Sequence, residues 1–257
     1  MYSNLPPPNT ENRQLENPYW GFWPTVGFGL AIGAAYLFVS VLIGIAFAVA
    51  ILLSDRHLSV AGVTDALNGK LGLFSSVGEF FTAVAAVGLI AIFIRAKKTI
   101  SIRQYLGLGK VNWRSLLGAL GIALALLVLS GGLGLLLKRP QSQFDINLYK
   151  TSVWPPLLWA ALIVFAPLFE ETLFRGFLFE GFLHSRMGAA LTIIITALVW
   201  SSLHIQYDLF DMANIFVLGL VLGAVRLRTG SLWNTMAMHA MWNLVATIQI
   251  AVTLAGH

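Results

Sequence analysis

The sequence contains several apolar runs that are long enough to cross a lipid bilayer. The segment from Leu30 to Leu53 carries no charged residue, and a helix of about 20 residues spans the hydrocarbon core. Inside a bilayer the backbone N–H and C=O groups must be bonded within the protein, so only helices and closed barrels can span it. Runs of this length are typical of helices. We therefore predict an all-α polytopic membrane bundle.

Composition agrees with this fold class. Of the 257 residues, 58% are hydrophobic and 11% are charged, whereas soluble proteins have about 25% charged residues. The length fits one bundle of about seven to eight transmembrane helices. The absence of cysteine excludes disulfides and thiolate metal sites. In such a chain the net charge of +5 reports orientation across the membrane, so the expected partner is the lipid bilayer and not nucleic acid.

Seven spans are expected along the chain. They cover residues 30–53, 71–94, 115–137, 154–183, 189–204, 213–225 and 231–254. The sixth is short for a full crossing. We divide the chain into a mobile N-terminal tail with an interfacial segment (1–28), N-terminal transmembrane helices (29–140) and a motif-bearing transmembrane core (141–257). Basic residues concentrate between Arg95 and Arg114 and at Arg226 and Arg228, which favours an N-terminus inside.

Three charges follow the uncharged run from Trp154 to Phe169. Glu170, Glu171 and Arg175 would lie at membrane depth on a helix that continues from this run, where ionisable groups are costly and mark functional sites. Glu171 and Arg175 are four residues apart and can form an ion pair. Glu170 points about 100° away from Glu171, so its carboxylate is available to a partner outside the Glu171–Arg175 pair.

Other polar residues interrupt the last apolar helices. His204 ends the fifth span, and His239 and Asn243 share one face of the seventh. At 1.5 Å per residue, Glu170 lies about 20 Å from Leu183 and His204 about 24 Å from the start of its own helix, so their depths are similar. These four side chains are therefore expected to meet in one intramembrane cavity.

The expected cavity suits activation of water. A glutamate with a neighbouring histidine can act as a general base, and an amide or a second histidine can stabilise an oxyanion. Glu170, His204 and His239 could instead hold a Zn²⁺ ion that leaves one position open for water. The residues alone leave both versions open.

The motifs themselves resemble those of one protease family. Glu170 to Arg175 matches E-E-x-x-x-R, Trp200 to His204 matches aromatic-x-x-x-His, and His239 to Asn243 matches H-x-x-x-N. Their order and spacing, with a weaker third motif at 216–223, are similar to those of the CPBP (Abi) family of intramembrane endopeptidases, which includes the type II CAAX prenyl endopeptidases. Trp200 stands where many relatives have Phe, a departure that keeps the aromatic ring.

The resemblance implies hydrolysis of peptide bonds in membrane-associated substrates, prenylated or of leader type. It assigns the activation of water to Glu170 and His204, and stabilisation of the oxyanion or ligation of a metal to His239 and Asn243. Glu171, Arg175 and Trp200 would be supporting residues. It also implies the cytoplasmic membrane of a bacterium as the location.

Other interpretations of the same residues remain open. The cluster could serve a non-catalytic immunity or scaffold protein, or a proton or cation carrier, because buried Glu and His also form relays. Glycines at close-packing spacing, including Gly219 and Gly223, predict close helix contacts. Glu79 in the second span is more typical of a structural pair than of a catalyst.

Overall fold

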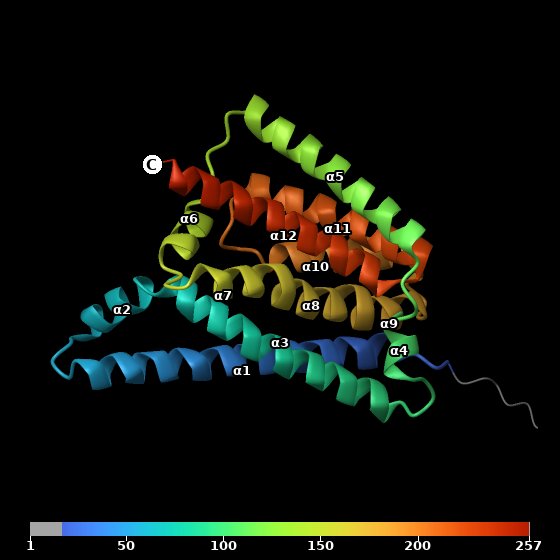
Figure 1. The fold of residues 1–257 in the computed structure, drawn as a ribbon. Helices are drawn as coiled ribbons and strands as arrows, with labels where there is room; N and C mark the ends of the chain where they lie inside the picture. Colours follow the sequence, from blue (N-terminus) through green and yellow to red (C-terminus); the bar gives the residue numbers. More distant parts are fainter. Residues whose placement is uncertain (1–16, 257) are drawn as a thin grey trace, which may run out of the picture.

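The computed structural model describes residues 17–256 as a bundle of helices (Figure 1). The long helices are α1 (Phe22–Ser54), α3 (Leu71–Ala96), α5 (Trp113–Leu136), α10 (Gly188–Ser202), α11 (Leu209–Thr229) and α12 (Leu232–Ala255). A further helix over 155–183 is continuous but changes its hydrogen-bonding pattern along its length, through α7 (Pro155–Ala160), η1 (Ala161–Phe165), α8 (Ala166–Glu171), η2 (Thr172–Leu178) and α9 (Phe179–Leu183). The described residues contain no strand, and the predicted all-α bundle is confirmed.

Among the described residues, six helices are long and apolar enough to cross a membrane, and α10 is a shorter apolar helix. All seven predicted spans are present as helices. The prediction was wrong about which one is short, because α11 extends from Leu209 to Thr229 and α10 stops at Ser202. Asp208 explains the early start of α11, since its carboxylate accepts the N–H groups of Phe210 and Asp211 as an N-cap.

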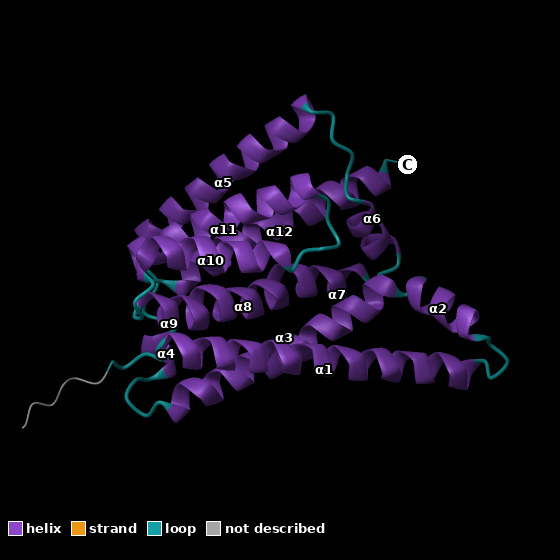
Figure 2. Ribbon diagram, turned by 180° about the vertical axis from the view of Figure 1, so that it is seen from behind, coloured by secondary structure: helices purple, strands orange, loops and turns teal. Residues whose placement is uncertain are grey.

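The helix over 155–183 lies at the centre of the bundle, with α1 and α3 on one side and α10, α11 and α12 on the other (Figures 1 and 2). It is the most buried of the candidate spans. Pro155 and Pro156 occupy its first turn, where a missing N–H costs nothing. This central position holds the charged motif away from lipid.

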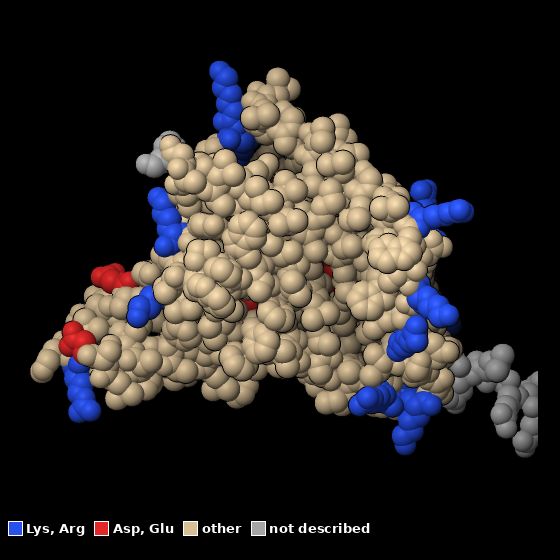
Figure 3. Space-filling model, in the orientation of Figure 1, with Lys and Arg blue, Asp and Glu red and all other residues tan. Residues whose placement is uncertain are grey.

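Three short helices lie at the two ends of the bundle. Helices α2 (Val60–Asn68) and α6 (Gln143–Lys150) are at one end, and α4 (Ile102–Tyr105) is at the other (Figure 1). Charged side chains gather at these ends and leave an uncharged belt between them (Figure 3). Small areas of acidic atoms are visible inside that belt, so some acidic groups lie far from both ends (Figure 3).

Helices from the predicted N-terminal and motif-bearing segments pack against each other. Helix α1 begins at Phe22, before the predicted boundary at residue 28. Helix α5 packs against α12 and α3 packs against α8, so the N-terminal helices and the motif-bearing core form one bundle. Residues 1–16 of the predicted tail lie outside the described residues.

Only some of the glycines allow close helix contacts. A Cβ on Gly219 would lie 2.9 Å from the Cβ of Ala197, and one on Gly223 would lie 3.1 Å from Ile193, so both glycines let α11 approach α10. Gly131, by contrast, faces open space. The close-packing prediction therefore holds for Gly219 and Gly223 of α11.

Candidate functional site

The charged motif begins in α8 and continues into the second of two π-helical segments. Helix α8 ends at Glu171, with η1 before it and η2 after it. In η1 the N–H of Ala166 donates to the carbonyl of Ala161, which is the i to i+5 pattern of a π-helix. Such segments are frequent at functional sites, where they turn side chains away from the regular helix spacing.

Glu171 forms a fully buried ion pair with Arg175. Arg175 Nη1 lies 2.9 Å from Glu171 Oε1, and both side chains are 0% exposed. The Nδ1 of His239 lies 3.1 Å from the same carboxylate oxygen. The predicted ion pair is thus present, and it also holds one ring nitrogen of His239. With Nδ1–H donating to Glu171, Nε2 of His239 is left for another partner.

Trp200 is the residue around which the other motif side chains gather. Its Nε1–H donates to Oε2 of Glu170. The imidazoles of His204 and His239 meet the indole edge-on, with ring centroids 5.4 and 5.2 Å away. The structure therefore brings Glu170, His204 and His239 together around one buried indole ring. Glu170 is half-buried, whereas Glu171 is fully enclosed.

The other contacts of Trp200 fix its own position. The guanidinium of Arg175 lies over the indole, 4.2 Å from its centroid, and Arg175 Nη2 also donates to the carbonyl of Gly219 at 3.3 Å. Gly219 belongs to the weaker third motif, so this segment supplies a backbone acceptor as well as close packing. The buried cation stabilises the ring through its π face.

Asn243 contacts the backbone just before the charged motif. Its Nδ2 donates to the carbonyl of Leu162 at 2.8 Å. In the π-helical pattern that carbonyl would accept from residue 167, but Pro167 has no N–H. The Asn243 amide supplies the missing donor. One N–H of the amide is thereby used, and a second is left for another acceptor.

Tyr207 and Asp145 extend the site, and the sequence analysis missed both. Tyr207 stacks on His204 with ring centroids 6.2 Å apart, and its hydroxyl donates to Asp145 Oδ1 at 2.7 Å. Burial raises the pKa of Tyr207 well above its ordinary value, and the charges of Asp145 and Glu170 add to this. The position of Tyr207 three residues after His204 was an available signal. Asp145 had none, because it lies 62 residues away.

A second carboxylate lies on the side of the site that faces α1 and α3. Tyr36 stacks on Phe169 with centroids 5.0 Å apart, and its hydroxyl donates to Glu79 Oε2 at 3.2 Å. The other oxygen of Glu79 is buried and has no partner among the described residues. Glu79 is therefore half of a structural pair, as expected, with one oxygen left over beside the motif helix.

Arg226 differs from its expected position. The charge count treated it as a residue of a basic loop, but it is 2% exposed within α11. Its Nε donates to the carbonyl of Arg175 at 2.8 Å and its Nη2 to Glu180 Oε1 at 2.6 Å. Arg226 therefore links α11 to the motif helix and carries no information about orientation.

The proposed zinc ligands are not gathered into one set in this structure. No three His, Asp or Glu side chains between residues 17 and 256 lie where they could hold a metal ion together. The Nδ1 atoms of His204 and His239 are occupied by Trp200 O and Glu171 Oε1, and Glu170 Oε2 accepts from Trp200. Each ring therefore presents Nε2, which can transfer a proton or ligate a metal.

Comparison with known proteins gives one match. Residues 152–245 match the family model described as type II CAAX prenyl endopeptidase Rce1-like. This segment contains all four motifs, from Glu170 to Asn243. No curated protein and no solved structure matches the chain. The family match confirms the resemblance to the CPBP family of membrane endopeptidases that the motifs predicted.

Proposed function

We propose that this integral membrane protein is an intramembrane endopeptidase that hydrolyses peptide bonds of membrane-associated substrates, prenylated or of leader type. The family match supports a protease. The single observation that carries the assignment of residues is the cluster around Trp200, where Glu170 accepts a hydrogen bond and both imidazoles contact the indole.

Glu170 and His204 activate the water in this proposal. Oε2 of Glu170 is occupied by Trp200 and Oε1 is free to take a proton. As the water oxygen attacks the carbonyl carbon, its proton passes to the carboxylate. His204 Nδ1 lies 2.9 Å from Trp200 O, which orients the ring and leaves Nε2 for the water or the leaving amine.

His239 and Asn243 stabilise the tetrahedral intermediate. His239, whose Nδ1 lies 3.1 Å from Glu171 Oε1, acts on the intermediate through Nε2. Asn243 offers the N–H that Leu162 does not use. When the C–N bond breaks, the proton taken from water passes to the amine, which gives one carboxylic acid and one amine product.

Water would reach the site from the end of the bundle that carries α2 and α6. Helix α10 stops at Ser202, and a polar series leads from His204 through Tyr207 to Asp145 of α6 at that end.

We also propose a cytoplasmic bacterial membrane with the N-terminus inside. Because the chain has no cysteine, Asp65→Cys and Lys110→Cys test the orientation. An impermeant thiol reagent should label the first from outside and the second only from inside.

The decisive experiment uses purified protein in detergent and a quenched, membrane-tethered peptide. Wild type should cleave it, and Glu170→Gln should lower the rate by about 10²-fold or more. Asp65→Asn, an exposed carboxylate on α2, is the control and should cleave normally. Binding of the peptide without cleavage would support the scaffold alternative. Proton uptake by proteoliposomes, without cleavage, would support the carrier.

A further inference from the structure

We propose that the chain binds an anionic diacyl phospholipid at a site between α5 and α11, away from the catalytic cluster. The site has two adjoining parts. One is an apolar groove of about 330 Å³, and the other is a polar pocket of about 300 Å³. Thr229, at the end of α11, lines both, so the two parts adjoin at this residue.

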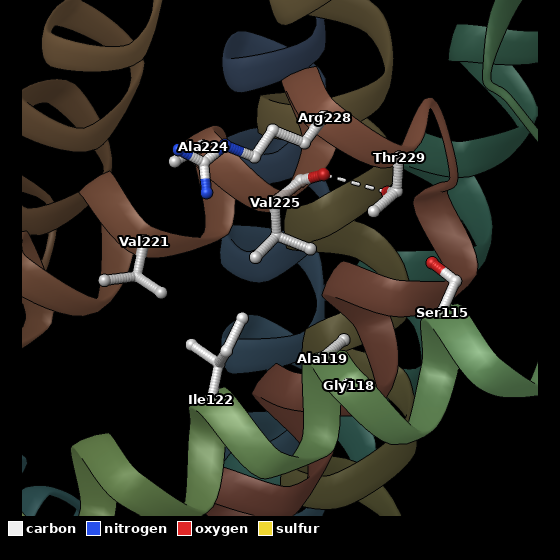
Figure 4. A pocket seen from close by; sticks show the side chains of 9 residues that line it. All are labelled: Ser115, Gly118, Ala119, Ile122, Val221, Ala224, Val225, Arg228 and Thr229. Carbon is white, nitrogen blue, oxygen red and sulfur yellow. Dashed lines mark hydrogen bonds between the residues drawn. The ribbon is translucent and has the colours of Figure 1, made fainter.

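The groove suits an acyl chain. Small and apolar side chains from the two helices line it: Gly118, Ala119, Ile122, Val221, Ala224 and Val225. Ile122 and Val221 point into the space between α5 and α11 (Figure 4). A Cβ on Gly118 would meet nothing within 4 Å, so the groove has room for a chain. In a membrane such a groove is filled by lipid.

The polar pocket suits a phosphate group. Arg103 and Lys110 line it together with Gly107 and Gly230. Arg103 uses Nε to bind the carbonyl of Leu108, which leaves its two terminal nitrogens for an anion. Arg228 lines the neighbouring groove, and its guanidinium extends back along α11 towards Ala224 (Figure 4). Two cations therefore line the polar pocket, and a third lies on the groove.

No described acidic side chain neutralises these cations. None of the ion pairs among residues 17–256 includes Arg103, Lys110 or Arg228. The α4 end of the bundle shows basic groups and no acidic ones in the face of Figure 3. Glu180 lies near that end, but it is buried against Arg226. Charge complementarity therefore favours an anionic headgroup, and basic pockets between transmembrane helices are recognised sites for such headgroups.

The groove is separate from the catalytic cluster because it uses the opposite face of α11. Gly219 faces Ala197 and Arg175, towards the cluster. Val221 faces α5, in the groove. The site is therefore distinct from the one that would hold the peptide substrate.

The test is binding of a fluorescent phosphatidylglycerol to the purified protein in detergent. Phosphatidylcholine with the same acyl chains should compete at least tenfold less well than unlabelled phosphatidylglycerol. Inorganic phosphate should not displace the probe, because it cannot fill the groove. Equal competition by the two lipids, or full displacement by phosphate, would overturn the proposal.

Two sets of variants locate the binding. Lys110→Gln combined with Arg228→Gln should weaken binding by more than about tenfold, since each cation near the surface contributes about fivefold. Arg56→Gln with Lys138→Gln, at the other end, is the matched control. Gly118→Leu should fill the groove and lower affinity, whereas Gly121→Leu, which also faces open space and does not line the groove, should not. Unchanged binding in the double charge variant, with normal elution on size exclusion, would refute the site even if Gly118→Leu does not fold.

Discussion

Asn243 donates its side-chain amide to the backbone carbonyl of Leu162, 81 residues earlier in the chain. This hydrogen bond replaces the one that residue 167 would donate to the same carbonyl in a π-helix, because Pro167 has no N–H. One residue of the candidate site thus holds the backbone that leads into the charged motif, and its structural and chemical roles can be separated by experiment.

The first prediction separates those two roles. Asn243→Ala leaves the Leu162 carbonyl without a partner and should lower stability by about 1–3 kcal/mol. In a Pro167→Ala background residue 167 can donate, so the same change should cost less. Peptidase activity of the Asn243→Ala variant should be below that of wild type in both backgrounds, because the Asn243 N–H proposed to stabilise the oxyanion is also lost. Thermal unfolding in detergent measures the loss of stability. An equal loss in both backgrounds would contradict a stabilising role for the hydrogen bond from Asn243 to the Leu162 carbonyl.

The second prediction concerns Trp200. Trp200→Phe keeps a ring against Arg175 and the imidazoles but removes the N–H that Glu170 accepts. A hydrogen bond to a charged group contributes about 1.5–3 kcal/mol, so kcat/KM should fall by about tenfold or more. Trp200→Ala is the comparison and should also lower the folded yield. A Phe variant with wild-type kinetics would show that this hydrogen bond does not act in turnover.

The third prediction uses the buried ion pair. Glu171→Gln leaves the cation of Arg175 without its counter-charge in a fully buried place, and such a loss costs about 3–5 kcal/mol. Adding Arg175→Gln removes the lone charge and should recover part of the folded yield. The yield of monodisperse protein on size exclusion is the measurement. If the double variant recovers no folded yield, Arg175 stabilises the fold mainly through its contacts with the Trp200 ring and the Gly219 carbonyl.

The fourth prediction is a pH dependence that comes from Asp145. Burial raises the pKa of its carboxyl above the ordinary value of 3.8, and the hydrogen bond from Tyr207 offsets this only in part. The folded state therefore binds the proton more tightly than the unfolded state, so the contribution of Asp145 to stability is greatest below about pH 4 and is lost as the pH rises through the folded pKa.

Asp145→Asn tests this pH dependence because it keeps an oxygen that can accept from Tyr207. The variant should unfold at a higher temperature than wild type at pH 7, and the difference should shrink towards pH 4. Asp65→Asn, on the exposed face of α2, is the control. A variant less stable than wild type at pH 7 would show that the ionised carboxylate is needed.

The fifth prediction addresses zinc. If Glu170, His204 and His239 hold Zn²⁺, a strong chelator should abolish cleavage and added Zn²⁺ should restore it. If Glu170 and His204 act as a general-base pair, protein shown by elemental analysis to contain no metal should still cleave the peptide. No three His, Asp or Glu side chains lie together among residues 17–256, so we expect the second result.

The sequence by itself determined the fold class and identified the motif residues of the candidate site. Uncharged runs long enough to cross a bilayer favour helices, because the backbone N–H and C=O groups find no hydrogen-bond partners in lipid and a helix pairs them within the segment. Spacing along one helix fixes which residues share a face, which is why the pairing of Glu171 with Arg175 could be predicted. The depths of Glu170 and His204 followed from helix rise alone.

Only the tertiary structure decided which atoms meet between helices. The contact of Trp200 with Glu170 depends on how closely α10 approaches the motif helix, and no sequence spacing encodes that distance. The bond from Asn243 to Leu162 requires a π-helical turn next to Pro167, and the Tyr207–Asp145 pair joins segments 62 residues apart. Arg226 looked like a loop cation because a sequence count cannot detect that Glu180 and the Arg175 carbonyl satisfy it inside the bundle. Such contacts are set by packing and by the need to pair every buried polar group.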